Sequence, residues 1–254
     1  MSPSELPALD CHAHIAPDVT PAQVAGLRGS LVFAMTRSPA EARAASRRND
    51  QTLLWGFGAH PGVPAAIAAV TEQVLARAVN DFPLIGEVGL DRRGPARQQQ
   101  VLEAVLTACS GQPVLLSLHS TGRTQELLRL LSQRPHPGAI LHWFNGTPEE
   151  IAEAVELGCY FSVNTAMTDE RLSLMPFNRL LPETDFPSSR RTIGARRPGD
   201  TAQLEHRLAE RNGVSTEAIR LGWYVNLRRL AATAGVTERL PRLWRDTLTS
   251  VPMK

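Results

Sequence analysis

The stretch Leu6-Pro7-Ala8-Leu9-Asp10-Cys11-His12-Ala13-His14 decides the fold, because it begins apolar and ends in polar side chains. Its start is typical of a buried strand, and the two histidines lie where that strand would end. Alternate side chains of a strand share a face, so Asp10, His12 and His14 are expected to point the same way. Two imidazoles with a carboxylate behind them can begin a metal site. An isolated pair of this kind is more often a pair of surface histidines than a metal site. The choice between the two depends on whether other parts of the chain supply further ligands.

Short apolar runs recur along the chain and alternate with segments of helical periodicity. Eight runs are predicted strands: Ala8–Ile15, Ser30–Thr36, Leu53–Ala59, Leu84–Leu90, Val114–His119, Ala139–Phe144, Cys159–Val163 and Arg179–Thr184. The intervening segments predict these helices: Ser38–Arg48, Ala65–Asn80, Arg97–Cys109, Gln125–Gln133 and Pro148–Leu157. After Thr201 the pattern predicts two or three more helices: Gln203–Asn212, Thr216–Leu221 and Tyr224–Ala234.

Strands that alternate with helices over short connections are expected to be parallel, and eight of them favour a closed (β/α)8 TIM barrel. An open doubly wound sheet is the other candidate, but it gives no reason for so many strands to end in polar residues. The extra C-terminal helices are expected on the outside of the barrel. Since no repeat or linker interrupts the pattern, residues 1–254 are predicted to form a single domain.

The composition of the chain bears on its class and on its cellular compartment. The net charge of the 254 residues is only +2, so bulk charge does not indicate a nucleic-acid binder. No apolar run reaches the roughly 18 residues of a membrane span, and the N-terminus lacks the features of a signal peptide. The cysteines Cys11, Cys109 and Cys159 are three in number and far apart, which argues against a disulfide framework. We therefore expect a protein of the reducing cytoplasm.

The histidines are concentrated at the ends of the predicted strands. Five of the seven lie there: His12, His14, His60, His119 and His142. Taken alone, each of the last three is at least as easily explained as a structural histidine as it is as a metal ligand. In a barrel, however, the C-terminal ends of all strands converge on one mouth, where active sites are built. These five side chains are therefore expected to meet.

Carboxylates occupy comparable positions. Glu87 lies inside the apolar run Leu84–Leu90, and an unpaired buried carboxylate is costly unless a cation or donors accompany it. Glu183 and Asp185 end the eighth predicted strand, where an ordinary acidic loop is the alternative. Nitrogen and oxygen ligands without thiolate suit Zn²⁺, Mn²⁺ or Mg²⁺. Six of these residues form the expected ligand set: His12, His14, Glu87, His119, His142 and Asp185. Six ligands exceed the needs of one tetrahedral ion, so two ions with a bridging carboxylate are expected.

Several motifs combine these residues in a recognisable order. They are Asp-x-His-x-His (residues 10–14), Gly-x-His-Pro (58–61), Ile-Gly-Glu-Val-Gly-Leu-Asp (85–91), the strand-five His119, His-x-Phe-x-Gly (142–146) and Leu-x-Glu-Thr-Asp-x-Pro (181–187). From Leu9 to about Ala231 the chain resembles the TatD-type metal-dependent deoxyribonucleases of the amidohydrolase barrel superfamily. Within that family, Leu141–Asn164 is similar to the subgroup tied to the Qat anti-phage defence system.

The resemblance implies a role for each matching residue. His12, His14 and Asp185 would hold one ion, His119 and His142 the other, with Glu87 bridging and Glu183 holding a third, weaker ion. His60 would contact the scissile phosphate or the leaving group, so that the catalytic residues are His60, Glu87 and Asp185. Asp10 would lie behind the ligands and orient an imidazole. Asn226 would brace the fold rather than catalyse.

The chain departs from the family pattern in the loops that shape the substrate groove. Arg92-Arg93 replaces an aromatic pair, and Arg196–Asp200 only echoes the family's Arg-Asn-Glu-Pro element. The segment Phe186–Pro198 carries four arginines and no acid, which suits a phosphate backbone as well as it suits a solvated loop. These candidate substrate residues are Arg190, Arg191, Arg196 and Arg197. Aromatic residues for base stacking are few, although Trp143 and Phe186 adjoin ligands.

The leading prediction is hydrolysis of DNA phosphodiester bonds with two divalent ions, Mg²⁺, Mn²⁺ or Zn²⁺, and a third, weaker one. Asp185 would accept the proton of the attacking water. The Qat resemblance implies a role in bacterial anti-phage defence and protein partners that include an ATPase and a subunit like a nucleobase-modifying enzyme. One alternative is a metal-dependent hydrolase of a small amide, ester or D-aminoacyl substrate. The other is a partner-bound subunit of a defence complex with little activity of its own.

Overall fold

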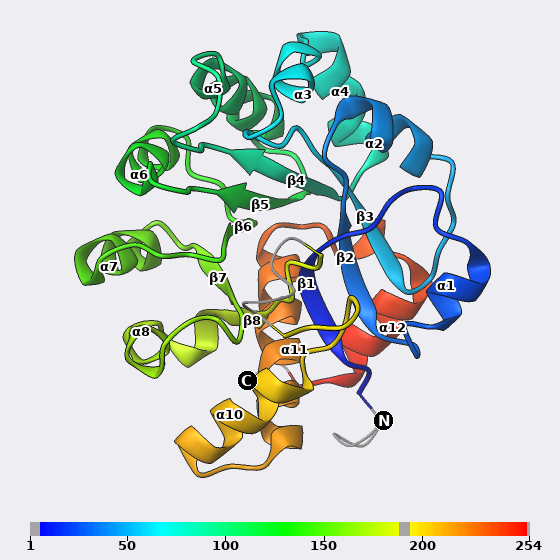
Figure 1. The fold of residues 1–254 in the computed structure, drawn as a ribbon, viewed down its shortest axis with the longest axis vertical. Coiled ribbons are helices and arrows are strands. Elements are labelled where there is room, and N and C mark those ends of the chain that lie inside the picture. Colours follow the sequence, from blue (N-terminus) through cyan, green and yellow to red (C-terminus); the bar gives the residue numbers. More distant parts are fainter. Residues whose placement is uncertain (1–5, 188–193, 253–254) are drawn as a thin grey trace.

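The computed structural model describes residues 6–187 and 194–252. Its centre is a sheet of eight parallel strands in sequence order, surrounded by helices (Figure 1). The strands are β1 (Leu9–His14), β2 (Leu31–Met35), β3 (Leu53–Phe57), β4 (Leu84–Gly89), β5 (Leu115–His119), β6 (Ala139–His142), β7 (Tyr160–Val163) and β8 (Leu180–Pro182). All eight predicted strands are confirmed. Nearly every strand residue is buried, as expected of a parallel sheet covered on both faces.

The ends of β1 and β8 hold the sheet together as a (β/α)8 barrel. The backbone N–H of Asp185 donates to the carbonyl of His12 at 2.8 Å, and the N–H of His14 donates to the carbonyl of Phe186 at 2.7 Å. These bonds join the segment after β8 to β1, which brings the first and last ligand-bearing segments side by side. The TIM-barrel prediction is thus confirmed.

Helices follow most strands and form the outer layer in Figure 1. They are α1 (Pro21–Ala25), α2 (Pro39–Ala45), α3 (Pro64–Ala68), α4 (Glu72–Asp81), α5 (Gln98–Cys109), α6 (Thr124–Gln133), α7 (Pro148–Glu156) and α8 (Asp169–Leu174). The start of α7 shows why the sequence forms a helix there. The Thr147 side chain accepts the N–H of Glu150, whose carboxylate accepts the N–H of Thr147, and Pro148 occupies the first turn.

Three further helices and two short 3₁₀ turns complete the described chain. These are α10 (Ala202–Asn212), α11 (Thr216–Thr233), α12 (Arg242–Ser250), η2 (Phe177–Arg179) and η3 (Thr237–Arg239). In residues 6–187 and 194–252, no helix combines the length and the apolar character that crossing a membrane requires.

Two helix predictions were wrong in their boundaries. The predicted helix Ala65–Asn80 is two helices, because the Thr71 side chain caps a new helix by accepting the N–H of Val74. The predicted break after Leu221 is absent, since α11 continues through Gly222. A Cβ at Gly222 would come within 2.6 Å of Phe177 Cε1, so glycine is there to admit the neighbouring ring. Helices α1, α8 and α12 had not been predicted.

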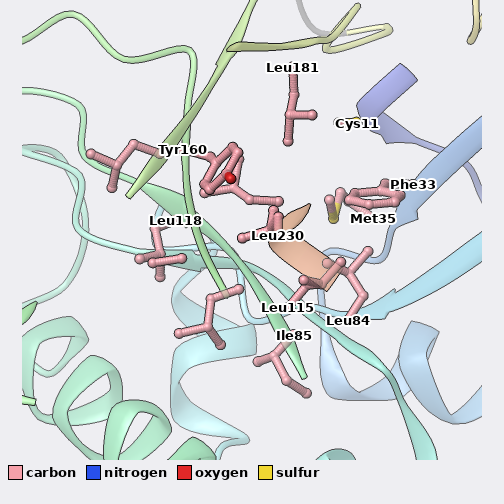
Figure 2. Packing of buried hydrophobic residues seen from close by; sticks show 14 of the residues in the cluster. Cys11, Phe33, Met35, Leu84, Ile85, Leu115, Leu118, Tyr160, Leu181 and Leu230 are labelled. Carbon is pink, nitrogen blue, oxygen red and sulfur yellow. The ribbon is translucent and has the colours of Figure 1, made fainter. Parts of the chain in front are cut away.

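The C-terminal helices contribute directly to the apolar core. Leu230 of α11 belongs to the same buried cluster as Met35 and Leu115 of the strands (Figure 2). Trp244 of α12 is fully buried, and its ring lies 5.4 Å from that of Phe33 in β2. These helices therefore pack against the strands of the barrel.

Candidate metal centre

The polar strand ends meet around the carboxylate of Glu87, which is almost completely buried. On one side, its Oε2 lies 3.1 Å from His14 Nε2, 3.4 Å from His60 Nε2 and 3.6 Å from His12 Nε2. Asp185 Oδ1 approaches the same nitrogens of His14 and His12, at 3.6 and 4.0 Å. The residues predicted for a first ion are thus gathered on one oxygen of Glu87.

The other oxygen of Glu87 faces the remaining two histidines. Its Oε1 lies 2.5 Å from His119 Nδ1 and 3.7 Å from His142 Nε2. The rings of His142 and His12 stack face to face with centroids 3.6 Å apart, so the two sets of ligands adjoin. One carboxylate therefore lies between two groups of imidazoles, an arrangement suited to a bridging ligand.

Local irregularities of the backbone accompany this convergence. The register of β1 shifts between Asp10 and Ala13, and that of β4 shifts between Ile85 and Val88. His12 and Glu87 lie inside these two irregular segments, where an extra residue can redirect a side chain. Asp185 has a φ of 45°, a left-handed conformation that is uncommon for residues other than glycine.

The chemistry of this cluster fits divalent cations. His12 Nε2 and Glu87 Oε2 are buried and have no hydrogen-bond partner among the described residues. Such unsatisfied groups cost roughly 1–3 kcal/mol each, and a cation would compensate for that cost. Ligand atoms of His12, His14 and Glu87 lie within 4.8 Å of one another, as do those of His60, Glu87 and His119. The donors are imidazoles and carboxylates, which suits Zn²⁺, Mn²⁺ or Mg²⁺.

Three of the histidines are each held at the ring nitrogen that faces away from Glu87. His12 Nδ1 lies 2.8 Å from Ser117 Oγ, His119 Nε2 lies 3.1 Å from Asp91 Oδ2, and His142 Nδ1 lies 2.9 Å from Glu183 Oε2. Partners of this kind fix ring orientation and tautomer in metal sites. The contacts of Ser117 with His12 and of Asp91 with His119 were not predicted from the sequence. The signal for Ser117 was a single hydroxyl within the apolar strand Leu115–His119.

Glu183 is fully engaged by neighbouring donors. Besides His142, its carboxylate accepts a hydrogen bond from the Ser162 hydroxyl and another from Asn164 Nδ2 at 2.8 Å. Ser162 belongs to β7, and Asn164 follows directly after it, so that strand positions the carboxylate. These contacts describe a support for His142. The third ion expected at Glu183 stays a prediction, although Glu183, His12 and His142 also form a possible ligand group.

The contacts of Asp10 among the described residues are with backbone groups and a hydroxyl, and its expected role in orienting an imidazole stays a prediction. Its carboxylate accepts the backbone N–H groups of His12, Thr184 and Gly199 at 3.2, 3.0 and 2.8 Å, and the Thr184 hydroxyl at 2.6 Å. The pKa of Asp10 is raised to about 7 because burial outweighs these hydrogen bonds. Asp10 therefore ties the backbone of β1 to the segments that follow β8.

His60 differs from the other histidines of the cluster. Its Nδ1 accepts the backbone N–H of Gly62 at 2.9 Å, so the proton of the neutral ring lies on Nε2. Its side chain is 23% exposed and lines the cavity at the mouth of the barrel. His60 is thus arranged as a hydrogen-bond donor toward that cavity.

Burial and charge set the protonation of the central groups. Burial lowers the pKa of His12 to about 3, so its ring is neutral at pH 7 and can offer a lone pair. Burial alone would raise the pKa of Glu87, but the His119 imidazole and its neighbours hold it well below the ordinary value. Burial raises the pKa of Asp185 to about 6, with His142 opposing the shift.

A cavity of about 480 Å³ opens over the cluster. Of the four arginines predicted to bind substrate, Arg190 and Arg191 lie outside the described residues. Arg196 is exposed and Arg197 partly buried, and neither is among the described residues that line the cavity. The lining is His14, His60, Glu87, Asp91, Arg93, His119, Ser120, Thr121, Gly122, Thr124, His142, Trp143, Asn145 and Asp185.

Comparisons with known proteins agree with this arrangement. The family model of the TatD related DNases matches residues 9–231. A protein of Enterobacter lignolyticus named 3'-5' ssDNA/RNA exonuclease TatD is 32% identical over 188 residues, which cover 66% of this chain and 71% of the relative. The protein of the same name from Escherichia coli is 27% identical over 209 residues, or 72% of this chain and 80% of the relative.

Solved structures show the same fold at lower sequence identity. YJJV, a TatD homolog from Escherichia coli, has a TM-score of 0.71 at 22% identity and covers 87% of this chain and 97% of its own. A TatD family hydrolase from Entamoeba histolytica has a TM-score of 0.70 at 14% identity and covers 89% and 98%. With its family motifs gathered at the mouth of the barrel and a family match that spans most of its length, this chain belongs to the TatD-related DNase family of hydrolases.

Proposed function

We propose that this chain hydrolyses phosphodiester bonds of DNA with two divalent ions, Mg²⁺, Mn²⁺ or Zn²⁺. The observation that carries the proposal is the position of Glu87, whose two carboxylate oxygens each face a separate set of imidazoles. Relatives named 3'-5' ssDNA/RNA exonuclease TatD support a nucleic acid as the substrate.

Each ion has its own ligands in this proposal. His12, His14 and Asp185 would hold one ion, His119 and His142 would hold the other, and Glu87 would be shared. A bound pair of divalent ions supplies Lewis-acid chemistry, which lowers the pKa of water and neutralises charge on a phosphate. Ser117, Asp91 and Glu183 would keep the rings in the orientation that this requires.

Two residues are placed to move or hold protons. The carboxylate of Asp185, which lines the cavity, would accept a proton from the attacking water. His60 presents its Nε2–H to the cavity, where it would donate a hydrogen bond to a phosphate oxygen or to the leaving group.

The test is digestion of single- and double-stranded DNA with Mg²⁺ or Mn²⁺. Asp185→Asn should abolish cleavage without lowering the thermal midpoint, since it removes a charge and keeps the shape. Asp246→Asn is the matched control, because Asp246 is an exposed residue of α12. Full activity of Asp185→Asn, or cleavage that persists in EDTA, would contradict the proposed metal-dependent mechanism.

The alternative of a small amide, ester or D-aminoacyl substrate stays a prediction. A panel of such substrates, compared with DNA at one metal concentration, separates the two proposals. Hydrolysis of one of these small substrates without hydrolysis of DNA would contradict our proposal and support the alternative.

A role in anti-phage defence is the finer part of the proposal. It rests on the similarity of residues 141–164 to the Qat-associated subgroup. In a host that carries this chain together with the partner genes, Asp185→Asn should abolish protection, as measured by plaque counts. Unchanged protection by that variant would contradict a catalytic part in defence and would favour the partner-bound, inactive subunit instead.

A further inference from the structure

The cavity extends beyond the metal ligands along one wall. That wall comes from the loops after β4, β5 and β6, which contribute Arg93, Thr121, Thr124, Trp143 and Asn145. None of these side chains belongs to the ligand sets around Glu87. The wall offers one aromatic face, one cation, two hydroxyls and an amide beside the position proposed for a scissile phosphate.

Trp143 is held at this wall by its backbone. It directly follows the ligand His142 and has a φ of 39°, which a bulky residue adopts only when its surroundings enforce it. Asn145 Nδ2 donates to the carbonyl of Trp143 at 3.0 Å and secures the turn. Trp143 is partly buried against the apolar core, and it also lines the cavity. An indole fixed in this way is a ready surface for a nucleobase.

Arg93 supplies positive charge at the rim of the same cavity. Its backbone N–H donates to Asp91 Oδ1 at 2.7 Å, which fixes the loop. Its side chain is 79% exposed, and Nε is 3.9 Å from that carboxylate, so the guanidinium is free to reach a phosphate.

We propose that Trp143 and Arg93 form a subsite for one unpaired nucleotide, whose base stacks on the indole next to the scissile phosphate. The inference rests on the proposed function and deepens it. The cavity volume of about 480 Å³ is in the range typical of small-molecule sites, roughly 300–1,000 Å³. An unpaired base has a free face that can lie on the indole.

Tryptophan fluorescence tests binding without turnover. The chain has four tryptophans, and Trp55, Trp223 and Trp244 are 7%, 0% and 0% exposed. Deoxyadenosine monophosphate should therefore quench emission saturably through Trp143, whereas deoxyribose 5-phosphate, which lacks a base, should not. Trp143→Phe should remove the quenching. Equal quenching by both ligands, or quenching that persists in Trp143→Phe, overturns the subsite.

Kinetics with two substrates tests selectivity. The substrates are a single-stranded oligonucleotide and the same oligonucleotide with an abasic site at the nucleotide next to the scissile phosphate. Trp143→Ala should lower the ratio of their kcat/KM values by about 5- to 150-fold, as expected from stacking of one base. Trp143→Phe should restore most of the ratio. An unchanged ratio in Trp143→Ala overturns the subsite, and so does a wild-type chain that cleaves the abasic oligonucleotide as well as the complete one. A wild-type chain that cleaves neither substrate contradicts the proposed function itself.

Discussion

The smallest unit of this centre is an imidazole with two different neighbours. In His12, one ring nitrogen faces the Ser117 hydroxyl at 2.8 Å, and the other faces Glu87 and has no hydrogen-bond partner among the described residues. The hydroxyl determines which nitrogen is left for a cation. The orientation of the His12 ring thus depends on a residue that lies outside the proposed ligand set.

Ser117→Ala tests that dependence. Loss of the hydroxyl should lower the affinity for Mn²⁺ by about 10- to 100-fold, the usual effect of removing such a partner. Isothermal titration of the metal-free chain measures it, with Ser132→Ala on the exposed face of α6 as the control. Equal affinities of wild type and Ser117→Ala would show that the ring needs no such support.

A second buried histidine has a purely structural role. The two ring nitrogens of His136 are both paired with backbone, Nε2 with the carbonyl of Cys109 and Nδ1 with the N–H of Gly138, each at 3.1 Å. These partners require a neutral ring. Burial lowers the pKa of His136 below its ordinary value, although the bond to Cys109 opposes this.

Acid should therefore remove the contribution of His136 to stability. The unfolded chain takes up the proton near the ordinary pKa of about 6.5 and the folded chain only at lower pH, so the contribution is complete above that value and declines below it. The difference in unfolding free energy between wild type and His136→Asn should be smaller at pH 5 than at pH 7. His206→Asn, at an exposed position of α10, is the control. A pH-independent difference would mean that the ring accepts the proton without penalty.

At the scale of elements, α11 links the C-terminal helices to the last strand. Asn226 Nδ2 donates to the carbonyls of Phe177 and Leu180 at 2.8 and 2.9 Å, which confirms the expectation that Asn226 braces the fold. The segment that it holds, η2 and the start of β8, leads directly to Glu183 and Asp185.

Removal of this brace should cost stability. Asn226→Ala deprives two carbonyls of their donor and should lower the free energy of unfolding by about 1–3 kcal/mol. Urea unfolding measures the change, and Asn178→Ala, at an exposed position of η2, is the matched control. If the two variants are equally stable, the amide contributes nothing to the fold.

Helix boundaries show where sequence patterns are insufficient. Thr71 is tolerated inside a helix and favoured at a cap, and only the path of the chain around Val70 decides between the two. Gly222 predicts a break by its own propensity, but the Phe177 ring that approaches it comes from another element. Such positions depend on contacts that no local pattern contains.

At the scale of the whole molecule, the barrel explains why the convergence of the candidate ligands could be predicted. The strand-end residues His12, Glu87, His119 and His142 each follow or interrupt an apolar run, and the fold alone brings such ends together. Their supports could not be predicted in the same way. Ser117 is 105 residues from His12 along the chain, and a serine in a strand carries no sign of its partner.

We propose that the mouth of this barrel binds two divalent ions and that Glu87 is a ligand of both. The most direct test is the metal-to-protein ratio of the chain by elemental analysis after equilibration with Mn²⁺ and removal of free ions. We predict about two ions per wild-type chain, as expected for a carboxylate-bridged pair, and a clear reduction in Glu87→Gln. A wild-type chain without bound metal, or a Glu87→Gln chain with undiminished metal content, would contradict the account.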